Sequence, residues 1–503
     1  MNLLLRIFLA ALIGLTLAFA FTISFMDLLD RPFVDQALLV FFAASAFGYL
    51  TFEILGARTQ IAQRLKNLPS GLRQFSNLSL SSEAIPSFFR EHWPGILLTI
   101  LFFAIYLYLG FRFNSPTNDT VDNYLDADNF AWMRRIAYPD GHEFEMRGPH
   151  PFAYFVFRPL GWLFNLFTRS PYLSAVLINT LIGALCVFLA WAFIKNHTRN
   201  RVYSVLIAIL LGLSTAHLFF GSVIESYIFS AAALMGFFLL LGSRKEDLAS
   251  QITLGLLTFG ITLTNFVQNF IGFVTARPRW REAIRFSGVT VSIGVLLSMI
   301  HAAWYPSASL FFLPSDAQAE SDFTLSIFSD PAWRAVGRVM LLIRTILLYT
   351  VIAPQPFVFT TEVGGTFPRF NFFRISPEDF RLSSYDGLDN VLVGAWALML
   401  LVAGILFLWN LIRARRADLS LAFALCLLFN FGLHLNYGYE PFLYSPDWAY
   451  ALIFFVALGL APLAKNRWFQ GGLAAFLVLL AYNQWQFIDF IFRTVEPFIQ
   501  RGG

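Results

Sequence analysis

The sequence predicts an all-α polytopic membrane protein that forms one domain. Hydrophobic residues make up 57% of the 503 residues and charged residues only 13%, whereas soluble domains carry about 25% charged residues. Apolar stretches of about 18 to 25 residues recur along the whole chain, and each is long enough to cross a bilayer as a helix. The charged residues gather in the connectors between these stretches, so the composition excludes a soluble globular fold.

The apolar stretches predict about 11 to 13 transmembrane helices, a number that depends on two ambiguous segments. The first stretch resembles a signal peptide, but it is long enough to be an uncleaved span. The clear spans are expected at residues 5–26, 36–55, 94–112, 171–194, 201–220, 224–242, 286–305, 389–411, 418–436, 447–464 and 470–489.

The two ambiguous segments are residues 252–275 and 331–353. The first has the length of one span, but it contains a polar break, TLTNFVQN, and basic connectors precede and follow it. Two short helices that turn near Asn265 are therefore expected, because broken helices are tolerated where they line a cavity. Asn265, Gln268 and Asn269 would line that cavity or satisfy the freed backbone groups. The second segment carries three arginines, which favour a helix in the interface, with a crossing helix as the alternative.

The distribution of positive charge sets the expected orientation. The connector between the second and third spans is basic, so the positive-inside rule places it in the cytoplasm. The loop at residues 113–170 then faces outside. We therefore expect a multi-pass protein of the bacterial cytoplasmic (inner) membrane, with its active site facing the periplasm. No basic run suggests a nucleic-acid partner, and Cys186 and Cys426 both lie in apolar stretches, where they support no disulfide framework.

The external loop at residues 113–170 holds an unusual density of acidic residues. Residues 120–137 have a helical apolar rhythm. A carboxylate held near others of its sign has a raised pKa and can act as a general base. The alternative is that these acids solvate the loop and balance its arginines. The two neighbouring helix faces are expected to hold Asp122, Asp126 and Asn129 on one and Asp128, Trp132 and Arg135 on the other.

The following segment, RGPHPFAYFVFRPLGWLF, is amphipathic and is expected to lie along the outer interface. Its Arg147, His150 and Arg158 could hold a phosphate, because arginine offers a charged fork to phosphate oxygens. Anchoring to lipid headgroups is the alternative.

Polar residues also occur at the outer ends of later spans. Glu225, in GSVIESYIFS, is either functional or reaches the surface by snorkelling. A lone histidine at such a place is more often a satisfied interface residue than a ligand. HExxH, CxxC, P-loop and GxSxG motifs are absent from the sequence. Two late external segments add further candidates: Arg369, Arg374 and Arg381 in one, and His434, Tyr437, Glu440, Tyr444 and Asp447 in the other.

These segments together resemble the glycosyltransferase C (GT-C) superfamily, which includes protein O-mannosyltransferases and aminoarabinose transferases. In that superfamily an early span leads into a long outer loop with an acidic motif, here DADNFAWMRRIA, followed by an amphipathic segment, here RGPHPFAYFVFRPLG. The later GSVIESY and TLTNFVQN pieces look like further family features. The resemblance covers most of residues 94–305. Residues 1–93 would be two added spans and a connector, 306–388 an external region, and 389–503 the C-terminal spans.

The resemblance implies a GT-C-like bundle with amphipathic helices in its external loops and an inverting glycosyltransferase activity. The sugar would move from a polyprenyl-phosphate donor to a hydroxyl of a lipid, glycan or protein acceptor. Asp126, Asp128 and Asp122 are rivals for the catalytic base. No cofactor is certain, although carboxylates could hold Mg²⁺ or Mn²⁺ without a sequence signature. The residues expected to bind substrate or its phosphate are Arg147, His150, Arg158, Glu225, Tyr227, Asn265, Arg369, Arg374, His434 and Tyr437.

Two other functions are alternatives for a membrane protein of this kind. An O-antigen-ligase-like or polymerase-like enzyme would hold a pyrophosphate on Arg369, Arg374 and Arg381. A lipid or glycan transporter would be built from paired structural repeats with access from both sides, and the sequence has no visible repeat.

Overall fold

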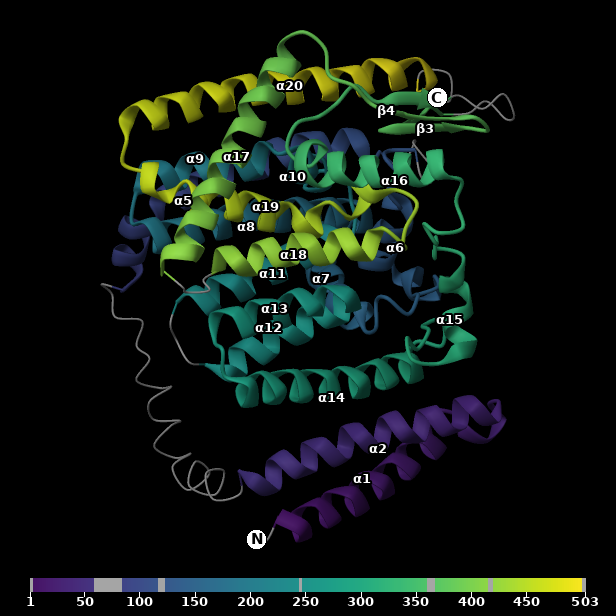
Figure 1. Ribbon diagram of the computed structural model, residues 1–503. Coiled ribbons are helices and arrows are strands. Elements are labelled where there is room, and N and C mark those ends of the chain that lie inside the picture. The colour runs from purple at the N-terminus through teal and green to yellow at the C-terminus, as the bar shows by residue number, and fades with distance from the viewer. Residues whose placement is uncertain are drawn as a thin grey trace.

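The computed structural model describes residues 3–57, 84–115, 123–243, 247–359, 367–414 and 419–499. Most of the long helices run nearly side by side and form a layered bundle (Figure 1). Within the described residues, seven helices are long and apolar enough to cross a membrane, as expected of an all-α, multi-pass membrane protein. They are α1 (Leu3–Phe25), α2 (Phe33–Gly56), α5 (Ala84–Phe113), α8 (Pro171–Thr198), α14 (Trp280–Trp304), α17 (Leu388–Ala414) and α20 (Arg467–Ile499).

Shorter apolar helices fill the centre of the bundle. Helix α19 is buried on nearly every side, as expected of a helix that is hydrophobic all round. The span expected at 201–220 is divided in two, because the chain turns out of the helix at Ser214. The shorter helices are α9 (Arg201–Leu213), α10 (Thr215–Phe220), α11 (Tyr227–Gly242), α12 (Leu248–Ile261), α13 (Phe266–Ala276), α18 (Leu419–His434) and α19 (Pro446–Gly459).

Helices α1 and α2 form a hairpin that lies beside α14 at the lower edge of the bundle (Figure 1). The two helices approach closely, since a Cβ atom at Gly14 would lie 2.6 Å from the backbone nitrogen of Gly48. Glu53 joins the hairpin to α14 through an ion pair with Arg285 of 3.0 Å. The two helices correspond to the first two predicted spans, at residues 5–26 and 36–55.

The prediction of a broken hairpin at 252–275 is confirmed. Helix α12 ends at Ile261, a 3₁₀ turn covers Leu263–Asn265, and α13 continues from Phe266. The segment at 331–353 forms α16 (Ala332–Arg344) and then one π-helical turn at Thr345–Tyr349. Helix α16 is not among the helices long and apolar enough to cross a membrane within the described residues.

The late external region also contains strands, which the all-α prediction did not include. Strand β1 (Phe357–Phe359) pairs with β2 (Arg369–Asn371), and β3 (Phe373–Ser376) pairs with β4 (Asp379–Leu382), both antiparallel. Strand β2 also contacts the first external loop, because Leu125 donates its amide proton to the Phe370 carbonyl, at 3.2 Å. The two external regions are therefore joined through their backbones.

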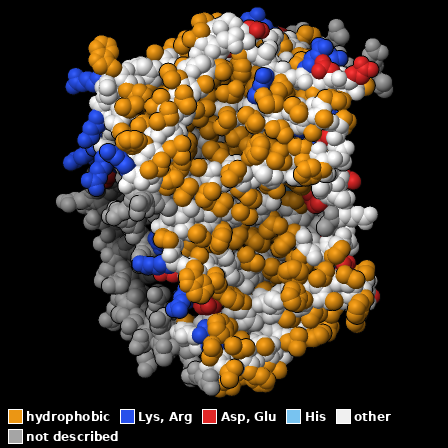
Figure 2. Space-filling view, in the orientation of Figure 1, with side chains coloured by type: hydrophobic (Ala, Val, Ile, Leu, Met, Phe, Trp, Pro, Cys, Tyr) orange, Lys and Arg blue, Asp and Glu red, His pale blue; other side chains and the backbone are white. Residues whose placement is uncertain are grey.

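The surface in Figure 2 has a broad hydrophobic band across its centre, and most charged side chains lie toward the two lateral edges. Lysine and arginine gather at the left edge, and most of the visible acidic side chains lie toward the right. Helices α6 (Asn129–Ala137) and α15 (Pro314–Ser321) and the strands β3 and β4 lie at the right edge in Figure 1. Both external loops therefore come together at one end of the bundle.

Candidate functional site

Two adjoining chambers lie at the end of the bundle where the external loops meet. The acidic chamber has a volume of about 410 Å³ and is lined by the carboxylate residues Asp126, Asp128, Glu225 and Glu440. The inner chamber has a volume of about 230 Å³ and extends to the turn between α12 and α13. The two chambers share four lining residues, Arg147, His150, Tyr227 and Tyr444.

The backbone of the first external loop turns its acids toward the acidic chamber. Leu125 and Asp126 both have left-handed conformations, with φ of 54° and 65°, which are costly for residues other than glycine. Tyr124 holds this turn in place, because its ring stacks on Phe370 and packs edge-on against Phe113. The local strain is thus maintained by aromatic packing beside the chamber.

The helical prediction for residues 120–137 is wrong for residues 123–128, and residues 120–122 lie outside the described residues. Helix α6 begins only at Asn129, after the left-handed turn at Asp126, so these two residues do not share a helix face. Asn129 is buried, and its side chain donates to Asn114 at 3.5 Å. Asp128 precedes the helix, and it lines the acidic chamber together with Trp132 and Arg135 of the helix.

Asp128 occupies the N-cap position of α6 without acting as a cap. An aspartate at this position usually accepts a hydrogen bond from the first turn of the helix, but the Asp128 side chain makes no such bond. Its backbone amide instead donates to Oε2 of Glu225, at 3.0 Å. The Asp128 carboxylate therefore lines the chamber while its backbone is held by a second acid.

Glu225 is fixed at the turn between α10 and α11 and is only 1% exposed. Two buried asparagines hold this turn: Asn114 accepts from the Ile224 amide at 3.0 Å, and Asn179 accepts from the Glu225 amide at 3.4 Å. Burial raises the pKa of Glu225 well above its usual value, and the nearby charge of Asp128 raises it further. Glu225 is therefore harder to ionise than an exposed glutamate.

His150 is held between the two chambers as a neutral ring. Its Nδ1 lies 2.5 Å from the Ile261 carbonyl oxygen, and its ring packs edge-on against Trp132. Burial lowers the pKa of His150 to about 3. Since a carbonyl can only accept, Nδ1 carries the proton and Nε2 is left as a hydrogen-bond acceptor.

Arg147 lies on the wall common to both chambers. Its Nε is 3.1 Å from Oε1 of Glu320, and its guanidinium lies over the ring of Phe323 at 4.0 Å. Tyr437 donates to the other oxygen of Glu320, at 2.9 Å. The arginine is therefore oriented by one carboxylate and one ring, while its charge lines the cavity.

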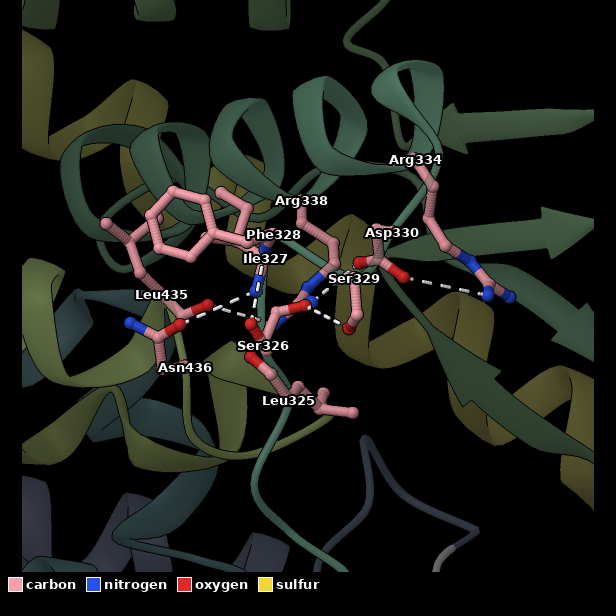
Figure 3. A network of polar contacts seen from close by, with 10 residues as sticks. All are labelled: Leu325, Ser326, Ile327, Phe328, Ser329, Asp330, Arg334, Arg338, Leu435 and Asn436. Atoms are coloured by element: carbon pink, nitrogen blue, oxygen red, sulfur yellow. Dashed lines mark hydrogen bonds and ion pairs between the residues drawn. The ribbon is translucent and has the colours of Figure 1, made fainter.

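Figure 3 shows how the segment from Leu325 to Asp330, which follows Phe323 in the chain, is held against the bundle. Arg338 of α16 donates to Asp330 at 2.6 Å and to the carbonyls of Leu325 and Leu435 at 3.1 and 2.9 Å. Asn436 accepts the Leu325 amide proton on its backbone carbonyl, at 2.9 Å. This network joins the late external helix to the end of α18, where the walls of the inner chamber begin.

A polar network lies beneath the inner chamber. Asn265 donates to Ser230 at 2.7 Å, and Gln268 donates to Asn265 at 2.8 Å and to the Asp447 backbone carbonyl at 3.1 Å. Tyr450 in turn donates to Gln268, at 2.8 Å. The break in the α12–α13 hairpin thus lines a cavity and also connects polar groups on two other helices, α11 and α19.

The structure brings most of the predicted site residues together and leaves some elsewhere. Asp122 lies outside the described residues. Arg158, Arg369 and Arg374 line neither chamber. The predicted residues that line one or both chambers are Asp126, Asp128, Arg147, His150, Glu225, Tyr227, Asn265, His434 and Tyr437.

The three arginines outside the chambers lie in other surroundings. Arg158 donates to the backbone carbonyls of Tyr138 and Pro139, so it fixes the turn that follows α6. Arg369 is exposed on β2. Arg374 is exposed on β3, directly opposite Arg381 of β4.

Sequence reasoning missed Glu320 and the aromatic residue beside it, Phe323. Glu320 lies in a short polar helix, α15, with no motif around it, and its pairing with Arg147 spans 173 positions of the chain. Only the folded arrangement identifies such a long-range pair. Among the described residues, no three His, Cys, Asp or Glu side chains are grouped so that they could hold a metal ion.

The chain matches no known protein-family model, and it has no detectable relative among curated proteins.

Proposed function

We propose that this protein is an inverting glycosyltransferase of the GT-C type in a bacterial cytoplasmic membrane. It would move a sugar from a polyprenyl-phosphate donor to a hydroxyl group of a lipid, glycan or protein on the outer face. The observation that carries this proposal is the convergence of Asp126 and Asp128 with Arg147 and His150 in one chamber at one end of the bundle. Carboxylates and a cation are the groups that such a transfer needs.

In the proposed reaction, Asp126 or Asp128 accepts the proton of the acceptor hydroxyl. The hydroxyl oxygen attacks the anomeric carbon, and the bond between that carbon and the phosphate oxygen breaks on the opposite face. The electron pair leaves with the polyprenyl phosphate, whose negative charge is stabilised by Arg147. Correct positioning and one general base supply most of the rate enhancement of such a displacement.

The surroundings of the acidic chamber agree with the proposed role of an aspartate as the general base. Glu225 accepts a hydrogen bond from the Asp128 amide, so it orients Asp128 at the wall of the chamber. Lysine and arginine gather at the edge of the surface opposite the external loops, which agrees with an outward-facing chamber. A ligase-like mechanism on the late arginines is less well supported, because Arg374 and Arg381 are exposed and line neither chamber.

A transfer assay tests the proposal. Purified protein in liposomes is supplied with polyprenyl-phosphate sugars and a membrane lipid extract, and the sugar appearing in other products is measured. Asp126→Asn and Asp128→Asn are compared with Glu143→Gln, a neutralised acid that is exposed in the same loop. The aspartate that acts as the base should lower transfer by about 10²- to 10⁴-fold when neutralised, whereas Glu143→Gln should not. Full activity in both aspartate variants would exclude these two residues as the base.

A further inference from the structure

Asp447 is a buried carboxylate in the wall of the inner chamber. It is the second residue of α19, and it is 3% exposed. Its Oδ1 atom has no hydrogen-bond partner within the part of the chain that the structure describes. An unpaired buried carboxylate oxygen is costly, so this oxygen in the cavity wall is available to a hydrogen-bond donor inside the chamber.

The neighbours of Asp447 hold the residue without satisfying that oxygen. The side chains of Asn265 and Ser230 lie within hydrogen-bonding reach of the Asp447 carboxyl group, and the Asn265 amide also donates to Ser230, but the Oδ1 atom is left without a partner among the described residues. Gln268 binds the Asp447 backbone carbonyl. The N-terminus of α19 favours a negative charge in its first turn, which explains how a carboxylate is tolerated there. It does not supply a hydrogen-bond partner for Asp447 Oδ1.

The other charged groups of the inner chamber are Arg147 and Glu320, and these two residues pair with each other. Asp447 is therefore the remaining carboxylate of this chamber that could accept from a ligand. Arg147 also lines the acidic chamber, where the proposed reaction takes place. A donor whose phosphate contacts Arg147 could thus extend its sugar toward Asp447.

The size and lining of the inner chamber favour a single sugar unit. Its volume of about 230 Å³ lies below the roughly 300–1,000 Å³ typical of pockets for drug-sized ligands. Aromatic rings form much of the wall: Tyr444 packs against Tyr227 at 5.2 Å and against His434 at 4.4 Å between ring centroids. Such rings combine apolar faces with polar edges, and a sugar ring needs both.

We propose that the inner chamber holds the sugar of the lipid-linked donor and that Asp447 Oδ1 accepts a hydrogen bond from a hydroxyl or ammonium group of that sugar. This inference rests on the proposed function. Asp447 would then determine which sugar is accepted. A site built to hydrogen-bond a polar substrate group discriminates strongly against analogues that lack the group, because its own buried polar atom is then left unpaired.

The test measures the melting temperature of the purified full-length protein in detergent with three probes. These are polyprenyl phosphate without a sugar, polyprenyl-phosphate glucose and polyprenyl-phosphate aminoarabinose. For the wild type, at least one sugar-bearing lipid should raise the melting temperature more than the bare lipid does. Asp447→Leu should keep the shift caused by the bare lipid and lose the additional shift caused by the sugar. Glu378→Gln, an exposed acid in the β3–β4 turn, is the matched control and should keep both shifts.

The Asp447→Asn variant distinguishes the two donor groups. Its amide retains an acceptor oxygen but no charge, so recognition of a hydroxyl should weaken modestly, whereas recognition of an ammonium group should be lost. The inference is overturned if bare and sugar-bearing lipids shift the wild type equally, or if Asp447→Leu keeps the sugar-dependent part. If even the bare lipid leaves the wild type unshifted, the proposed function is contradicted as well.

Discussion

The loop at residues 113–170 and the late region at residues 306–388 are both rich in charged residues, but the two regions place these side chains differently. In the first loop, a strained turn and a buried glutamate direct Asp126 and Asp128 to the wall of a chamber. In the late region, Arg374 and Arg381 lie opposite each other on a two-stranded ribbon and remain exposed. Charge density in a loop therefore does not identify a site by itself. The backbone must also turn that charge toward a cavity.

After the aspartate variants of the transfer assay, the largest effect is expected from Arg147, the cation shared by the two chambers. Arg147→Gln keeps a hydrogen-bonding side chain but removes the charge, and one charge-assisted hydrogen bond contributes about 1.5–3 kcal/mol. The KM for the polyprenyl-phosphate donor should rise about 10- to 100-fold, with a smaller change in kcat. Initial rates at varied donor concentration measure the two constants separately. An unchanged KM would show that the phosphate binds elsewhere.

The contact between α6 and α7 (Ala153–Thr168) is the next feature to test. A Cβ atom at Gly161 of α7 would collide with the backbone carbonyl of Ile136 in α6. Gly161→Ala should therefore displace α6 and lower the free energy of unfolding by about 1–3 kcal/mol. Gly404→Ala is the control, because nothing lies within 4 Å of its added atom. Thermal unfolding in detergent compares the two variants, and equal stability would contradict the close packing.

The protonation of Glu225 predicts a dependence of stability on pH. Because burial raises the pKa of this residue above 4.5, the native protein retains a proton that the unfolded chain releases. This contribution to stability is complete below pH 4.5 and decreases as the pH rises through the native pKa. Glu225→Gln should lack this part of the decrease, which melting temperatures of both proteins across the pH range would reveal. Parallel curves would indicate that Glu225 is ionised in the native state.

The smallest effect is expected in the late region. The double variant Arg374→Gln/Arg381→Gln removes two exposed charges that line neither chamber. Transfer should stay within about twofold of the wild type, because surface substitutions away from a site usually change little. A large loss of transfer would reverse the comparison between the two regions and favour a ligase-like mechanism.

The sequence predicts the helices well because long apolar stretches have few alternatives in a membrane. The break near Asn265 is also predicted, since polar residues interrupt an apolar run there. The helix at 120–137 is mispredicted because local periodicity does not register the tertiary contacts of Tyr124 with Phe113 and Phe370. The strands escape prediction for a related reason, because each is only three or four residues long and its pairing depends on the folded arrangement.

In the candidate site, too, the local features can be predicted from the sequence and the tertiary contacts cannot. Acids and arginines can be recognised in the loops, but their partners cannot. The sequence gives no indication that Glu320 pairs with Arg147, or that the Asp447 carboxylate has an oxygen without a protein partner. Arg158 illustrates the reverse case, because it resembles a phosphate-binding residue in the sequence but donates to the backbone after α6.

An experimental structure with bound polyprenyl-phosphate sugar tests the central claim most directly. The account predicts the phosphate beside Arg147, the sugar in the inner chamber, and Asp126 or Asp128 within about 2.6–3.2 Å of the position of an attacking hydroxyl. A donor bound outside both chambers, or with its anomeric carbon facing away from both aspartates, would contradict the account.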